Sequence, residues 1–216
     1  MAKIKNKFKL TRTVDGITYV SSKAYQAHVR AKRGTYTPIS LADGMKRSAA
    51  EQTQANLMAK IVFDAVNKFA PKFKDGKFWS RLVSAFRLLI KEKNSKGYKP
   101  LDGLEVRPDY PMSKQGNFRL MKRVDALVFS YRLKIATGYR LSILRMATDQ
   151  DMLIPYPDDV IIMVIGEDEL DGKVLLHFDA LPDEAQILYV MKCEQLVNGK
   201  LIGKLSQKSV SFLSVS

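Results

Sequence analysis

Lysine alternates with other side chains over the first ten residues of the chain. The lysines are Lys3, Lys5, Lys7 and Lys9, and the positions between them include Ile4, Phe8 and Leu10. Because successive side chains of a β-strand point to opposite faces, this period of two predicts a strand with one cationic face and one mostly apolar face. Asp15 and Gly16 then stand between two β-rich runs, which is a strong signal for a tight turn. We therefore predict a β-hairpin over residues 3–21.

The pattern changes to a helical period after a Thr-Pro segment around Pro38. Two sets of apolar residues recur at intervals of three and four, which is the spacing of one face of an amphipathic helix. The first set is Met58, Ile61, Val62, Ala65, Val66 and Phe69, and the second is Trp79, Leu82, Val83, Phe86, Leu89 and Ile90. We expect the first helix to end at Pro71 and both helices to bury these faces against each other, the hairpin or the second half of the chain.

From Leu104 onward the period is mostly two. Strand-like runs cover residues 124–133, 139–146, 160–165, 173–178, 187–196 and 210–215, and Gly, Pro, Asp and Asn separate them. Short strands at this spacing are typical of an antiparallel sandwich or barrel, and Asn198-Gly199 marks a further hairpin.

These patterns predict an α+β protein, with an N-terminal β-hairpin and two amphipathic helices joined to a C-terminal antiparallel β-sandwich. The division places a basic hairpin-plus-helices region at residues 1–100 and a β-sandwich-like domain at residues 101–216. The pattern leaves open whether these halves are separate domains or one fused core.

Positive charge is concentrated toward the N-terminus. Of a net charge of +14, residues 1–100 carry 22 Lys and Arg against 6 Asp and Glu, whereas residues 147–216 carry 5 against 12. Such a distribution favours binding to a polyanion or to the acidic end of another copy. The candidate basic face comprises Lys3, Lys5, Lys7, Lys9, Arg30, Lys32, Arg33, Lys77, Arg81, Arg87 and Lys91. The candidate acidic face comprises Asp158, Asp159, Glu167, Asp168, Glu169 and Asp171, the last four in a predicted hairpin connection.

The chain offers few groups suited to catalysis. His28 and His177 lie far apart in the sequence, and Cys193 stands in an apolar run, where a lone thiol usually packs as a small hydrophobe. Neither a nucleophile elbow, a phosphate-binding loop nor a metal-ligand spacing is found. The carboxylates between Gly166 and Gly172 lack the ligand order of an EF-hand, which favours a solvated turn over a calcium site. We therefore expect no enzyme activity, cofactor, metal or small-molecule substrate.

The sequence also bears on the compartment. No apolar run approaches the roughly 20 residues of a bilayer-spanning helix, and the basic start is not followed by the apolar segment of a secretory signal. A single cysteine excludes an internal disulfide. We expect a protein without membrane contact, located in the cytoplasm or within a particle assembled there.

Two binding functions fit this charge distribution. The first is a structural protein whose basic N-terminal face meets the acidic face of a neighbour, either in a head-to-tail homo-oligomer or with other subunits of a larger, phage-like particle. The alternative is a sequence-independent nucleic-acid-binding protein, with Tyr25, Tyr36 and Tyr98 available for base stacking.

Three stretches resemble a family of basic, functionally uncharacterised Bacteroidota proteins of roughly 200 residues. They are the Gly16-Ile17-Thr18 hairpin with the basic residues that follow, the helical middle through Arg81-Leu82 to residues 101–105, and Val197-Asn198-Gly199 with its closing strand. The resemblance implies a helical front joined to a β-rich back. It supplies no activity, and it lowers the expectation of an enzyme because no catalytic constellation is associated with the family.

Overall fold

The computed structural model describes residues 12–21, 27–32, 42–92, 98–123, 126–201 and 203–215. Contacts between residues divide the chain into two compact units, Met1–Ala49 and Ala50–Ser216. The division does not fall at residue 100, because both amphipathic helices bury their apolar faces in the same core as the C-terminal strands. The question left open by the sequence is thus answered in favour of a fused core for residues 50–216.

The N-terminal unit contains an antiparallel sheet in the order β1-β2-β3. Its strands are β1 (Arg12–Val14), β2 (Ile17–Val20) and β3 (His28–Ala31). Asp15 and Gly16 form the turn between β1 and β2 with φ angles of 48° and 75°. Two positive φ values match the right-handed twist of the flanking strands, which is why Asp-Gly is favoured here. The hairpin prediction is confirmed for residues 12–20, β3 was not predicted, and the proposed strand over residues 3–10 lies outside the described residues.

Helix α1 spans Asp43–Phe69 and helix α2 spans Phe78–Lys91. Helix α1 ends close to the predicted place, just before Pro71. The start of α1 lies well before Met58 because the preceding segment is rich in the helix formers Ala, Gln and Glu although it lacks an apolar face. Trp79 remains 37% exposed, so the buried face of α2 begins with Phe78 instead.

The remaining strands form two antiparallel sheets. The first has the order β10-β9-β6-β7, and β11 also pairs with β9; the second has the order β4-β5-β8. The strands are β4 (Gly116–Lys122), β5 (Leu127–Leu133), β6 (Gly138–Thr148), β7 (Asp159–Ile165), β8 (Asp171–Leu176), β9 (Gln186–Val197), β10 (Lys200–Leu201) and β11 (Lys208–Leu213), and short 3-10 turns cover Lys99–Leu101, Met112–Lys114 and Leu205–Gln207. Strand β4 was not predicted. The Asn198-Gly199 hairpin is confirmed between β9 and β10.

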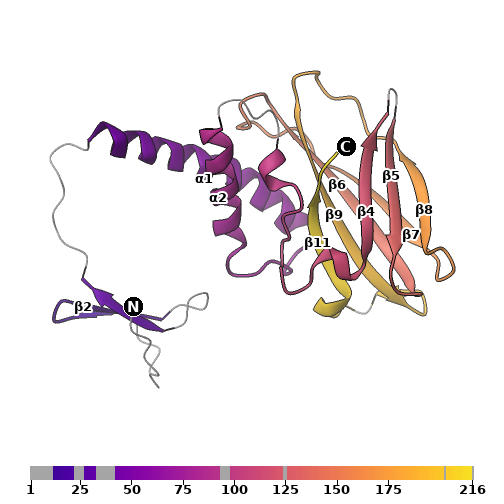
Figure 1. The fold of residues 1–216 in the computed structure, drawn as a ribbon, viewed down its shortest axis with the longest axis horizontal. Coiled ribbons are helices and arrows are strands. Elements are labelled where there is room, and N and C mark those ends of the chain that lie inside the picture. The colour runs from indigo at the N-terminus through magenta and orange to yellow at the C-terminus, as the bar shows by residue number, and fades with distance from the viewer. Residues whose placement is uncertain are drawn as a thin grey trace. The chain divides into compact units, whose positions relative to one another are not determined.

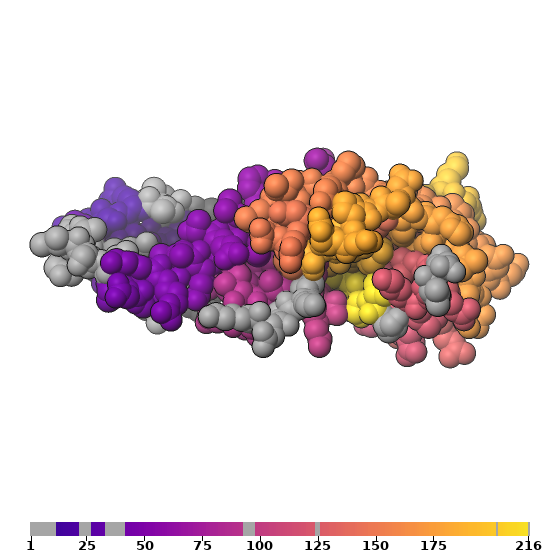
Figure 2. Space-filling model, turned by 90° about the horizontal axis from the view of Figure 1, so that it is seen from above, coloured from indigo at the N-terminus to yellow at the C-terminus, as the bar shows by residue number. Residues whose placement is uncertain are grey.

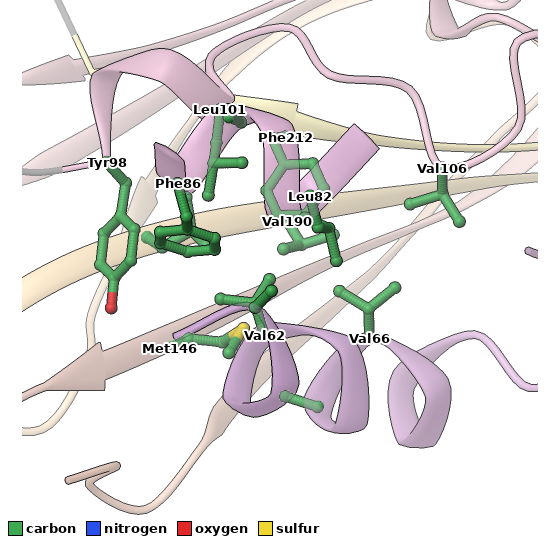
Figure 3. Packing of buried hydrophobic residues seen from close by; sticks show 14 of the residues in the cluster. Val62, Val66, Leu82, Phe86, Tyr98, Leu101, Val106, Met146, Val190 and Phe212 are labelled. Carbon is green, nitrogen blue, oxygen red and sulfur yellow. The ribbon is translucent and has the colours of Figure 1, made fainter. Parts of the chain in front are cut away.

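The central strands β6 and β9 of the first sheet bury side chains on both faces. The α-helices lie on one side of β6, β9 and β11, and the second sheet lies on the other side (Figure 1). On the helix side, α1 and α2 contribute Val62, Val66, Leu82 and Phe86, which pack with Met146, Val190 and Phe212 from the strands (Figure 3). The other face buries Leu141, Ile143, Met191 and Cys193 together with Leu120, Phe129 and Leu133 from the second sheet. Strict alternation along β6 and β9 therefore directs neighbouring side chains into two different clusters.

The connection from β7 to β8 is not the hairpin that the sequence suggested. β7 pairs with β6 in the first sheet, whereas β8 pairs with β5 in the second sheet. The acidic segment after Gly166 therefore crosses from one sheet to the other. Local sequence predicts a reversal of direction, but it does not say which sheet receives the next strand.

Candidate functional site

Arg81 does not belong to an exposed basic face. Its guanidinium lies 2.8 Å from a carboxylate oxygen of Asp75 and donates to the main-chain oxygens of Glu105 and Val106 at 3.1 and 3.0 Å. Burial alone would raise the pKa of Asp75, but hydrogen bonds from Arg81 and from the Lys77 amide outweigh this and lower it. Arg81 thus connects α2 to the segment beside β11, and we assign it a structural role.

The other candidate basic residues fall into three groups. Arg30, Lys32, Lys77 and Lys91 are exposed, Arg87 is partly buried, and Lys3, Lys5, Lys7, Lys9 and Arg33 lie outside the described residues. Residues 1–49 carry 11 Lys and Arg against 2 Asp and Glu, whereas residues 50–216 carry 25 against 20. Most of the excess positive charge therefore belongs to the N-terminal unit.

Asp159 is compensated within its own sheet. Its carboxylate lies 3.4 Å from Arg145, which also donates to the main-chain oxygen of Asp179 at 2.7 Å and stacks over the ring of Phe178. The register places Arg145 of β6 directly opposite Asp159 of β7. Cross-strand pairing of this kind cannot be read from a charge count, and it removes Asp159 from the acidic face available to a partner.

Asp158 lines a cleft of about 580 Å³ between α1 and the segment before β7. Leu57, Met146 and Leu153 form apolar parts of this cleft, and Lys68 lies on its rim. Partial burial raises the pKa of Asp158, while the charge of Lys68 opposes that shift. In the space-filling view, the orange surface of this segment borders the purple surface of α1 (Figure 2). Acidic and basic side chains are therefore interspersed here. The exposed members of the candidate acidic face are Asp158, Glu167, Asp168, Glu169 and Asp171.

Strand β7 is an edge strand with unusual apolar exposure. Among the described residues it pairs with β6 alone. Val160, Ile162 and Val164 project from one face of the strand and are 44%, 61% and 69% exposed. Isolated exposed apolar residues are common. Three such residues at alternate positions on one face of an edge strand, however, offer a docking site for another strand. The sequence showed this apolar run and did not show that it would lie at an edge.

Glu105 is a second group that sequence reasoning missed. It lines a cleft of about 600 Å³ formed by β4, β11 and the residues between Gly103 and Ser113. One carboxylate oxygen accepts the Met112 amide at 2.8 Å, and the other is buried without a hydrogen-bond partner among the described residues. Burial raises the pKa of Glu105 to about 7, although the Met112 and Ser211 groups oppose the shift. No motif marks this residue, because its environment is created by strands distant in the sequence.

Glu105 is expected to make stability depend on pH. A carboxyl whose folded-state pKa exceeds its unfolded value binds more protons in the folded state, so stability falls as the pH rises from 4.5 through 7. The full pKa shift corresponds to a loss of about 3 kcal/mol in the free energy of unfolding. Solvent in the cleft screens the charge and reduces this loss to about 1–2 kcal/mol. In Glu105→Gln, the free energy of unfolding should no longer decrease between pH 5 and pH 8, as measured by urea unfolding at both pH values.

The matched control is the exposed Glu184→Gln, which should keep the pH profile of the unmodified protein. If Glu105→Gln retained that profile as well, the buried carboxyl would not be the titrating group.

The remaining candidate chemical groups are dispersed. Cys193 is fully buried between the sheets, and burial raises the pKa of its thiol, which disfavours the reactive thiolate. His177 is exposed just after β8, and His28 lies in β3 of the other compact unit. In the part of the chain that the structure describes, no three His, Cys, Asp or Glu side chains gather as metal ligands.

A charged cluster on the first sheet completes the set of unusual sites. Glu194 is surrounded by Arg140, Lys192 and Lys208. None of these four residues was predicted as a site from the sequence. A signal was present, since charged residues occur inside runs of otherwise apolar strand residues. Buried charges in a sheet interior are rare unless they are paired.

The described helices also bear on membrane insertion, since none of them has both the length and the apolar character required to span a bilayer. In comparisons with protein-family models, curated proteins and solved structures, no significant match to the chain was found.

Proposed function

We propose that this protein is a non-enzymatic assembly protein in which the basic N-terminal segment of one copy binds the β7 edge of another copy. The observation that supports this most directly is the unpaired β7 edge with its three exposed apolar side chains. An edge of this kind offers main-chain N–H and C=O groups to an added strand and apolar surface for that strand to cover.

Residues 3–10 have the composition that this edge requires. Their lysines alternate with residues that are mostly apolar, so an extended conformation presents an apolar face and a cationic face. Asp158 precedes the seven-residue strand β7, and the exposed carboxylates of Glu167, Asp168 and Glu169 follow it. Negative charges at both ends of the acceptor strand favour encounter with a lysine-rich partner and help to set the register of that partner.

The scaffold behind this edge is inferred to be a β-sandwich. Residues from both sheets share one buried cluster, which is the arrangement of two sheets packed face to face. Because the donated segment and the acceptor edge differ, the contact is heterologous and repeats as a ring or an open filament. A cytoplasmic particle, such as a phage-like assembly, is the setting that this proposal favours.

Deletion of residues 2–10 should abolish oligomers and leave a folded monomer. The donated strand would be lost, whereas every described element of the fold would remain. Ile162→Lys should have the same effect from the acceptor side, because it places a charge in the middle of the apolar edge. Sedimentation velocity at low salt measures the loss of oligomers, and circular dichroism verifies folding.

The control for Ile162→Lys is Leu88→Lys, which adds the same charge at an equally exposed apolar position on α2. This variant should assemble like the unmodified protein. Oligomers that persist in both the deletion variant and Ile162→Lys would refute assembly through this edge.

The second candidate function is sequence-independent binding of nucleic acid by the N-terminal unit. The excess of 11 basic over 2 acidic residues in this unit is the observation that favours it. Phosphate contacts by lysine and arginine release counterions, so affinity for any sequence should fall steeply as salt rises. Nuclease treatment separates the two functions: protein assembly should survive it, whereas nucleic acid that copurifies with the protein would be removed.

A further inference from the structure

Three cationic side chains converge on one buried carboxylate at the helix-covered face of the first sheet. Arg140 of β6, Glu194 of β9 and Lys208 of β11 are cross-strand neighbours in a single row. Arg140 donates to one oxygen of Glu194 from Nε at 3.0 Å and from Nη2 at 2.6 Å, and Lys208 lies 2.7 Å from the other oxygen. Lys192, two residues before Glu194 on the same face, lies 3.8 Å from the carboxylate.

The cluster carries more positive charge than its carboxylate can neutralise. Within the described part of the chain, the ion pairs of all three cations lead to Glu194, so two positive charges remain. The side chains of Arg140, Lys192 and Lys208 are only 32%, 14% and 22% exposed. Charges withdrawn from water to this degree are costly unless a partner of opposite charge is present. The cluster is therefore electrostatically incomplete as a purely structural network.

Lys192 shows the effect of this excess. Burial, together with the charges of Arg140 and Lys208, lowers its pKa, although Glu194 opposes the shift. Its ammonium donates to the main-chain oxygen of Phe69 at 3.0 Å and lies over the ring of the same residue. These contacts hold Lys192 at the C-terminal end of α1, beside the other two cations.

Hydrogen-bond donors remain available in the cluster. Glu194 engages Nε and Nη2 of Arg140, which leaves Nη1 for another acceptor. Lys208 has one side-chain contact with Glu194 and two further ammonium protons. The hydroxyl of Ser142, directly opposite Lys192 in the sheet, is buried and has no hydrogen-bond partner within the described ranges of the chain. Glu194 acts as a positioning residue, because it holds two cationic groups in place from either side.

We propose that Arg140, Lys192 and Lys208 form a binding site for a small dianion that carries a phosphate group. Two uncompensated positive charges match the charge of a phosphate dianion. A planar guanidinium and rotatable ammonium groups are the donors that proteins use for tetrahedral oxyanions. The ligand class is inorganic phosphate or a phosphate monoester. The site adjoins the exposed face of β7, because Arg140 lies directly opposite Val164 in the sheet, but phosphate binding by one chain does not depend on assembly.

Inorganic phosphate is the first probe, and phenyl phosphate is the second. Phosphate should raise the melting temperature of the full-length protein relative to chloride at equal ionic strength, and isothermal titration calorimetry should give a saturable isotherm with one site per chain. Lys208→Met removes one cation and leaves Arg140 to pair with Glu194, so apparent affinity should fall by at least about tenfold. Tighter binding of phenyl phosphate would identify a monoester as the preferred source of the phosphate group.

Lys200→Met is the matched control, since Lys200 is exposed on β10 and lies outside the cluster. It should bind phosphate like the unmodified protein. Arg140→Lys is the second variant, because it keeps the charge and removes the bidentate guanidinium; affinity should fall here too. Absence of a phosphate-specific shift in the unmodified protein, or equal affinity in Lys208→Met and Lys200→Met, would overturn the proposal.

Discussion

Replacement of Phe212 by alanine should lower the free energy of unfolding by about 3–5 kcal/mol, the usual cost of removing a fully buried phenyl ring. Phe212 is 1% exposed, and its ring centre lies 6.3 Å from that of Phe78 in α2. Its side chain projects from β11 into the core shared with the helices, where it packs with Leu82 and Val190 (Figure 3). The loss should therefore reach both helices and strands, and chemical denaturation measures it.

The same variant tests whether helices and sheet form one cooperative core. Trp79, the single tryptophan, reports on α2 by fluorescence, and far-UV circular dichroism reports on the whole fold. In Phe212→Ala, the unfolding transitions followed by the two signals should move together to lower denaturant concentration. Leu88→Ala, at an exposed position on α2, should change stability little. A fluorescence transition that did not respond to Phe212→Ala would show that α2 unfolds independently of β11.

Glu194→Gln should cost about 3–5 kcal/mol, because it leaves three cations close together without their shared carboxylate. Burial alone would raise the pKa of Glu194, but hydrogen bonds from Lys208 and Arg140 and the charge of Lys192 outweigh it and lower the pKa. A carboxylate with a lowered pKa stabilises the fold above its unfolded value of 4.5, and this contribution is lost as the pH falls through the folded-state pKa. The deficit of the variant should thus be full at pH 7 and shrink in acid.

Urea unfolding of Glu194→Gln at pH 7 and pH 4 measures this deficit. Glu184→Gln makes the same chemical change at an exposed position and should be nearly neutral at both pH values. A loss below about 1 kcal/mol at pH 7 would mean that the carboxylate does little to offset repulsion among the cations.

Elements with a strong local signal were predictable from the sequence. The Asp15-Gly16 and Asn198-Gly199 turns need only a residue pair that accepts positive φ, and two apolar periods marked the buried parts of α1 and α2. Strand β4 escaped because its sequence, Gly-Asn-Phe-Arg-Leu-Met-Lys, alternates poorly and contains both glycine and asparagine. It is a strand because β5 pairs with it along its whole length.

The candidate sites were less predictable than the elements. Arg81 and Asp159 counted as surface charges in the sequence, yet each pairs with a group that the fold brings to it. Glu105 and Glu194 looked ordinary, and their unusual environments come from strands and helices far away in the chain. Charge counts describe a segment, whereas electrostatic partners depend on distances between segments.

The sequence by itself determined the hairpin turns, the amphipathic helices, most of the strands and the basic excess of the first 49 residues, because each is a property of neighbouring residues. The tertiary structure alone decided that β7 and β8 belong to different sheets, that β7 is left as an edge, and that three cations meet at Glu194. These features depend on strand order and register, which are set by burial of the whole core and not by any local pattern.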